Sequence, residues 1–168
     1  MRPNPSLEPT RYAGGSARTL GVRDLAPDYP SAMSQKKIYE IDGYHFSTLE
    51  EFYDEISRVL IPGAGWGCNL DAFNDILRGG FGTPEEGFVL RWNNADISRQ
   101  RLSYVETERQ LTLRLERCHP SNKLFVKNDL ERAKKEQGAT VFDWLIEIIQ
   151  IHCGSGEEEE DGIELVLS

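Results

Sequence analysis

The apolar residues Ile38, Tyr39 and Ile41 predict a short strand, which the Asp-Gly turn at 42–43 closes. After this turn the apolar residues recur every 3.6 positions, which predicts an amphipathic helix that ends at Pro62. Its buried face is expected to hold Leu49, Phe52, Tyr53, Ile56 and Leu60. Ser47 and Glu50 have the spacing of a capping box, so we expect Ser47 to cap this helix and Glu50 to reach back to it.

A glycine-flanked loop and a second helix come next. Residues 65–68 read Gly-Trp-Gly-Cys, and the two glycines favour a flexible, exposed position for Trp66, although a core position is the alternative. Asn69 is a good N-cap for a helix over about 70–77. Its expected buried residues are Leu70, Phe73 and Leu77.

The rest of the chain alternates between strand and helix patterns. We expect a strand at 88–92, a helix at about 93–103, one or two helices at 104–137 broken at Pro120, a helix at 142–149 and a strand at 163–167. Short apolar strands separated by helices pair in parallel, because each connection is long enough to cross over. The pattern therefore predicts an α/β fold with a three-stranded parallel sheet packed against helices.

Residues 1–34 have no hydrophobic period and contain five of the eight prolines of the chain. Such a segment cannot bury enough apolar area to offset its ordering entropy. We therefore predict a disordered leader at 1–34 and one domain at 35–168, with Met33 as a candidate for the true start.

Charge and cysteine content narrow the function classes. The 168 residues have a net charge of −9, which repels nucleic acid and attracts basic partners. Three cysteines without a paired spacing argue against disulfides and favour a reducing compartment. We also find no transmembrane run or signal sequence, so we expect a cytoplasmic protein that binds neither membranes nor nucleic acid.

The run Gly67–Leu77, Gly-Cys-Asn-Leu-Asp-Ala-Phe-Asn-Asp-Ile-Leu, closely resembles the signature of the barstar family of ribonuclease inhibitors. Trp66 occupies the aromatic position of that signature, and Asp75 its second aspartate. The order of strands and helices and the C-terminal Ile-Glu-Leu-Val-Leu-Ser are similar as well. The resemblance covers about 36–102 and 138–168 and leaves out the segment 104–137, which implies a helical insertion in a barstar-like fold.

The resemblance implies that the loop and second helix enter the active site of a basic ribonuclease, and that the protein is a monomer when free. The expected partner-binding residues are Trp66, Gly67, Asn69, Asp71, Asn74, Asp75 and Arg78. Some positions depart from the family. Gly65 and Asn74 replace aromatics, Arg78 replaces a small polar residue, and Ile148 and His152 replace glutamates.

The two aspartates have a chemical reason to act as a pair. Four residues apart on a helix, Asp71 and Asp75 share one face, where two fixed carboxylates can imitate phosphates in a cationic cleft. Capping alone would explain an Asp in the first turn, but not Asp75. Arg78 can pair with Asp75 or lie solvated at the rim, or it can meet an acid of the cognate nuclease.

Other polar clusters are open to simpler interpretations. The acidic run 157–161 is expected to be a solvated loop, and Cys68 an inert thiol. Cys118-His119 and His152-Cys153 lack the spacing of a zinc site, so we predict no metal and no cofactor.

Two rival functions remain. The chain can be an immunity or regulatory protein for a different basic toxin or enzyme. A hydrolase using Asp71, Asp75 and His45 is the third class, but the sequence has no nucleophile elbow, phosphate loop or metal motif. We therefore predict that the protein is not an enzyme and has no catalytic residues.

Overall fold

A computed structural model describes residues 36–80 and 82–168. The predicted leader at 1–34, with its candidate start at Met33, lies outside the described residues. The elements follow the order β1 (Lys37–Asp42), α1 (Leu49–Val59), α2 (Leu70–Leu77), β2 (Phe88–Asn93), α3 (Ala95–Arg101), α4 (Tyr104–Arg117), η1 (Pro120–Asn122), α5 (Lys123–Ala133), α6 (Val141–Ile151), η2 (Glu159–Asp161) and β3 (Glu164–Leu167). Within the described part, no helix is both long and apolar enough to cross a membrane.

The three strands form one sheet in the order β1-β2-β3, and both pairings are parallel. In the register, Ile41 lies beside Trp92, and Trp92 beside Leu167. One face is buried, because alternate residues of β1 and β2 point into the core. The other face is more exposed and carries the ion pair of Arg91 with Glu40. The predicted α/β fold with a three-stranded parallel sheet is confirmed.

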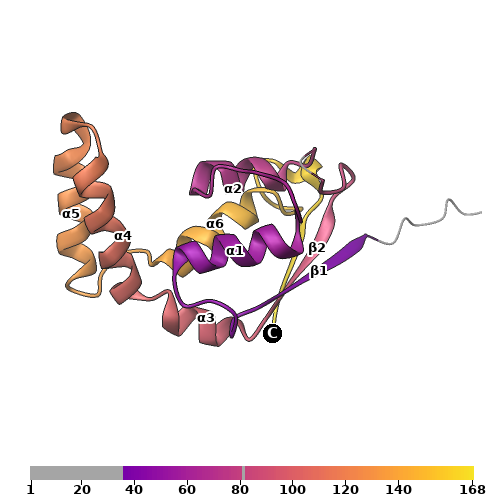
Figure 1. Cartoon of the computed structure of the whole chain (residues 1–168), viewed down its shortest axis with the longest axis horizontal. Helices are drawn as coiled ribbons and strands as arrows, with labels where there is room; N and C mark the ends of the chain where they lie inside the picture. The colour runs from indigo at the N-terminus through magenta and orange to yellow at the C-terminus, as the bar shows by residue number, and fades with distance from the viewer. Residues whose placement is uncertain (1–35, 81) are drawn as a thin grey trace, which may run out of the picture. The chain divides into compact units, whose positions relative to one another are not determined.

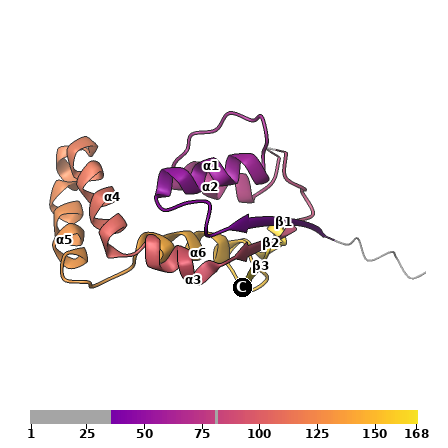
Figure 2. The same ribbon diagram turned by 60° about the horizontal axis from the view of Figure 1, so that its bottom comes forward.

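Aromatic side chains join the buried face of the sheet to the helices. Phe52 of α1 stacks on Trp92 of β2 at 5.5 Å between ring centroids, and it meets Phe46 and Phe73 edge to face. All four rings are almost completely buried. Figures 1 and 2 show α1 and α2 on one side of the strands, with α6 close to them. The core therefore fixes α2 through Phe73, which leaves the opposite face of α2 to solvent.

Helices α4 and α5 form a hairpin that extends away from the sheet (Figures 1 and 2). The predicted break at Pro120 is confirmed, since Pro120 begins the short helix η1 between them. The hairpin has a small apolar cluster of its own, made of Leu111, Val126, Leu130 and Ala133. Trp144 of α6 packs against both this cluster and the main core, so it connects the hairpin to the domain.

Glu106 anchors α4 to the start of α1. Its buried carboxylate accepts the backbone N–H of Leu49 at 2.9 Å, the guanidinium of Arg109 at 2.7 Å and the amide of Gln110 at 2.9 Å. Burial alone would raise the pKa of Glu106, but these hydrogen bonds together lower it below its ordinary value. Charged Glu106 therefore holds the base of the hairpin against α1.

The start of α1 differs from the predicted capping box by one residue. Thr48 is the N-cap and accepts the N–H of Glu51, and Glu51 reaches back to the N–H of Ser47 at 2.6 Å. The prediction of Ser47 as the cap and Glu50 as its partner is wrong. Glu50 instead pairs with Arg109 and Gln110 of α4, a tertiary contact that local spacing does not reveal.

Glu106→Gln is expected to destabilise the protein by about 2 kcal/mol at neutral pH, because a charge-assisted hydrogen-bond network becomes a neutral one. A carboxylate with a lowered folded pKa stabilises the fold above its unfolded pKa, and loses that effect as the pH falls through the folded pKa. The difference in free energy of unfolding between parent and variant should therefore start to shrink below pH 4.5, the ordinary pKa of glutamate. Urea unfolding at several pH values measures it. Exposed Glu116→Gln is the matched control, and an equal, pH-independent loss in both variants would contradict the anchor.

Candidate functional site

Trp66 connects the loop before α2 to helix α1. The indole Nε1 of Trp66 donates to the Oγ of Ser57 at 2.7 Å, and its ring meets Tyr53 edge to face at 5.3 Å. Trp66 is half-buried against the core. Trp66 is therefore less exposed than expected and closer to the alternative of a core position, since α1 offers both an aromatic face and a hydroxyl acceptor.

The residues between Trp66 and α2 form a tight helix start. Asn69 is the N-cap, as predicted, and its side chain accepts the N–H of Ala72 at 2.9 Å. A Cβ at position 67 would lie 2.8 Å from Asn69 Nδ2, so only glycine fits Gly67 without moving the cap. Cys68 is exposed and has φ of 44°, a left-handed conformation that costs a non-glycine residue of order 1–3 kcal/mol.

Helix α2 has the predicted bounds and presents its two aspartates to solvent. Phe73, Ile76 and Leu77 are its buried residues, whereas Leu70 is only half-buried. Asp71 and Asp75 lie on the exposed side, separated by about 6 Å along the helix axis. Among the described residues, Asp71 takes part in no ion pair. The predicted pair of carboxylates on one exposed face is thus present.

Arg78, directly after α2, is held by acids of this chain. Its guanidinium makes a two-pronged contact with Glu158, with both N–O distances at 2.6 Å, and a further bond of 2.9 Å to Asp75. Hydrogen bonding to Glu158 raises the pKa of Arg78, and the same contact lowers the pKa of Glu158. Pairing with Asp75 is confirmed. Arg78 is nevertheless about half exposed, and two acids of its own chain bind its guanidinium.

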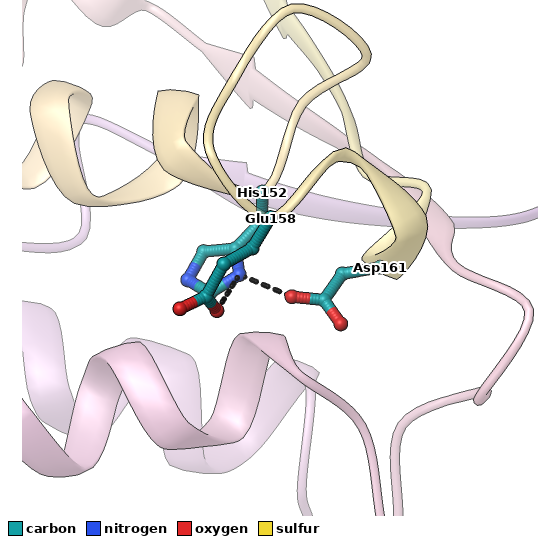
Figure 3. Close-up of side chains that lie close together, drawn as sticks. All are labelled: His152, Glu158 and Asp161. Carbon is teal, nitrogen blue, oxygen red and sulfur yellow. Dashed lines mark hydrogen bonds and ion pairs between the residues drawn. The ribbon is translucent and has the colours of Figure 1, made fainter.

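Asn74 connects α2 to the C-terminal part of the chain. Its Oδ1 lies 2.9 Å from Nε2 of His152, which is completely buried at the end of α6. The other ring nitrogen, Nδ1, lies 2.6 Å from Asp161 and 3.4 Å from Glu158 (Figure 3). His152 therefore faces the interior of the protein.

The acidic run 157–161 is only partly a solvated loop, because three of its acids are exposed but Glu158 and Asp161 are paired. Glu158 and Asp161 bind the side chains of Arg78 and His152, and they close the segment over the end of α2. His152, Glu158 and Asp161 also have the composition of a metal site, with their ligand atoms within 4.8 Å of one another. Arg78 already covers both carboxylate oxygens of Glu158, so hydrogen bonds and charge pairing account for this cluster.

A groove of about 590 Å³ lies between the start of α2 and helix α4. Cys68, Asn69 and Asp71 line one wall, and Arg114 and Arg117 of α4 line the other. Sequence reasoning missed these arginines, because they are distant in sequence and form no local pattern with α2. The groove extends the exposed face of α2 towards the hairpin.

The residues of the hydrolase alternative do not gather in one cavity. His45 Nδ1 lies 3.0 Å from Glu55, and both line a small depression beside α1. Asp71 lines the groove near α4 instead. Nothing in this arrangement supports cooperation between His45 and the two aspartates.

The described part of the chain is thus an α/β domain with a three-stranded parallel sheet and an exposed acidic helix after a capped loop. Residues 36–117 match the family described as Barstar (barnase inhibitor), so this part of the chain is barstar-like. The matched range contains β1, α1, α2, β2, α3 and α4, and it ends inside the segment predicted as an insertion. Comparison with curated proteins gives no match.

Proposed function

We propose that the protein is an inhibitor that binds a basic ribonuclease and covers its active site with the loop 66–69 and helix α2. The observation that carries this proposal is the exposed pair Asp71 and Asp75 on a helix fixed by its buried face, inside a barstar-like domain. The family is described by its inhibition of barnase, so a ribonuclease is the first class of partner to test.

The chemistry of a ribonuclease cleft fits this surface. A site that binds phosphate groups presents cationic side chains, and carboxylates on a rigid helix can pair with them without large reorganisation. The net charge of −9 would steer a basic partner towards the protein. In this proposal the protein has no catalytic residues of its own, and it works as a free monomer until it binds.

The bond from Arg78 to Asp75 does not block such binding. Both side chains are about half exposed, and an exposed ion pair of this kind contributes only about 0–1 kcal/mol. Asp75 can therefore exchange Arg78 for a cation of the partner at small cost. Glu158 keeps Arg78 in place during that exchange.

A different basic toxin or enzyme is the second candidate, and the departures at Gly65, Asn74 and Arg78 favour it. These replacements alter the surface around the aspartates, so the cognate partner need not resemble barnase. We place either function in the cytoplasm. All three cysteines are free thiols, which suits a reducing compartment.

The test is a titration of the purified protein against a panel of small basic ribonucleases that includes barnase, with residual RNA cleavage as the readout. We expect stoichiometric inhibition of at least one, with association that slows steeply as salt rises and dissociation that changes less. If the protein binds none of them but binds another basic protein, the second candidate holds. Turnover of RNA or esters by the protein itself would contradict both.

A further inference from the structure

We propose that the groove between α2 and α4 belongs to the same partner-binding surface, and that Arg114 and Arg117 receive an acidic side chain of the ribonuclease. This inference rests on the proposed function, since the same partner covers α2 and fills the groove. It assigns a role to the α4–α5 hairpin, namely to supply a second, cationic wall beside the acidic helix.

The two arginines are placed to bind a carboxylate together. Three residues apart on α4, Arg114 and Arg117 lie about one turn apart and share one side of the helix. Both are exposed, and neither has an ion pair among the described residues. Arg109, on the same helix, is by contrast paired with both Glu50 and Glu106. The groove therefore contains two guanidinium groups with free hydrogen-bond donors.

The helix dipole explains only part of this arrangement. Basic residues near a helix C-terminus are favourable, and both arginines lie in the last turn of α4. That effect does not require them to face α2. Their position opposite Cys68, Asn69 and Asp71 gives one groove with opposite charges on its two walls.

The groove is continuous with the proposed inhibitory surface, because Asn69 and Asp71 belong to both. A protein bound to α2 must therefore cover the mouth of the groove. A nucleic acid fits poorly, since Asp71 and Glu50 line the groove and would repel phosphates. A protein segment that carries an acidic side chain next to a basic cleft can pair with the arginines of α4 and with Asp71 at the same time.

Contacts at both ends hold the backbone of the second wall against the domain. Glu106 binds the first turn of α4 to α1, and Trp144 lines the groove and packs against both apolar clusters. Binding of a partner would therefore order mainly the two exposed arginine side chains, and not the helix that carries them.

The sign of a charge reversal tests the inference. The double change R114E/R117E is compared with K127E/K135E, which alters net charge equally on exposed residues of the same hairpin region. Against a basic ribonuclease, long-range electrostatics predict that both doubles bind as well as the parent or slightly better. A carboxylate held in the groove predicts instead that R114E/R117E binds at least about tenfold more weakly, through faster dissociation.

Association and dissociation rates are measured on a ribonuclease that the parent inhibits, with D75A in parallel and unfolding midpoints on the same samples. Weaker binding by R114E/R117E, with unchanged binding by K127E/K135E, supports the groove as part of the binding surface. If D75A loses inhibition while R114E/R117E behaves like K127E/K135E, the groove is wrong and the inhibitory helix stands. If the parent inhibits no ribonuclease, both proposals fail. Should R114E/R117E unfold, R114Q/R117Q replaces it, with a smaller loss expected in the same direction.

Discussion

Asp75→Ala is expected to weaken inhibition more than any other single surface change, by roughly 2–5 kcal/mol, or from about 30-fold to several thousand-fold. Removing the carboxylate would leave cations of the ribonuclease buried without a counter-charge. Losing one partner of a buried ion pair costs much more free energy than losing one partner of an exposed pair. Folding should change by only about 0.5 kcal/mol, because Asp75 is exposed in mid-helix and alanine is the better helix former. The inhibition constant and the unfolding midpoint are measured on the same samples.

Two matched variants make this result specific. Asp71→Ala is expected to be the second most damaging change, since Asp71 shares the exposed face of α2. Arg78→Ala should be much milder, because Arg78 is already satisfied by Glu158. Full inhibition by Asp75→Ala, or a failure that unfolding explains, would rule out the plug mechanism.

His152→Ala is expected to lower the free energy of unfolding by about 3 kcal/mol and to weaken partner binding through α2. The imidazole is completely buried, so its removal leaves a cavity and deprives both Asn74 and Asp161 of a hydrogen-bond partner. Helix α2 then loses a connection to the end of α6. Denaturant unfolding measures the first effect, and dissociation from the inhibited ribonuclease measures the second.

His119→Ala is the control for this change, because His119 is an exposed histidine whose ring bonds only a neighbouring serine in the described structure. It should alter stability by no more than about 0.5 kcal/mol. Equal stability losses in the two variants would contradict the role of the buried histidine. Faster dissociation of His152→Ala at a temperature where it is fully folded would show that the network positions α2.

Most of the fold could be predicted from the sequence, because its elements are short and strongly patterned. The bounds of α2 followed from Asn69 and the two glycines after Arg78, and the break at Pro120 followed from proline chemistry. The start of α1 could not be predicted to the residue. Either Ser47 or Thr48 can cap a helix, and the choice depends on the distant contact of Glu50 with α4.

The candidate site could be predicted only where its residues are local. The spacing of Asp71 and Asp75 determined their shared face, and the cap at Asn69 was evident. The contacts of Arg78 and Asn74 were not, since Glu158 and His152 lie about 80 residues away. A histidine or an acidic run has no pattern that reveals a buried network, and Trp66 could be placed only once Ser57 was seen as its acceptor.

The hydrogen bond from the Tyr104 hydroxyl to the carbonyl of Gly138, 2.9 Å long, ties together the two ends of the α4–α5 hairpin. About 70 residues separate β2 from β3, and doubling a loop raises its closure entropy by only about 0.6 kcal/mol. Because the two ends of the hairpin lie together, its residues add little to the distance that the connection between β2 and β3 must close. During folding, the two distant strands can therefore find each other almost as if the hairpin were absent. Changes of length at the tip of the hairpin, away from the contacts of Glu106 and Trp144, should therefore be tolerated.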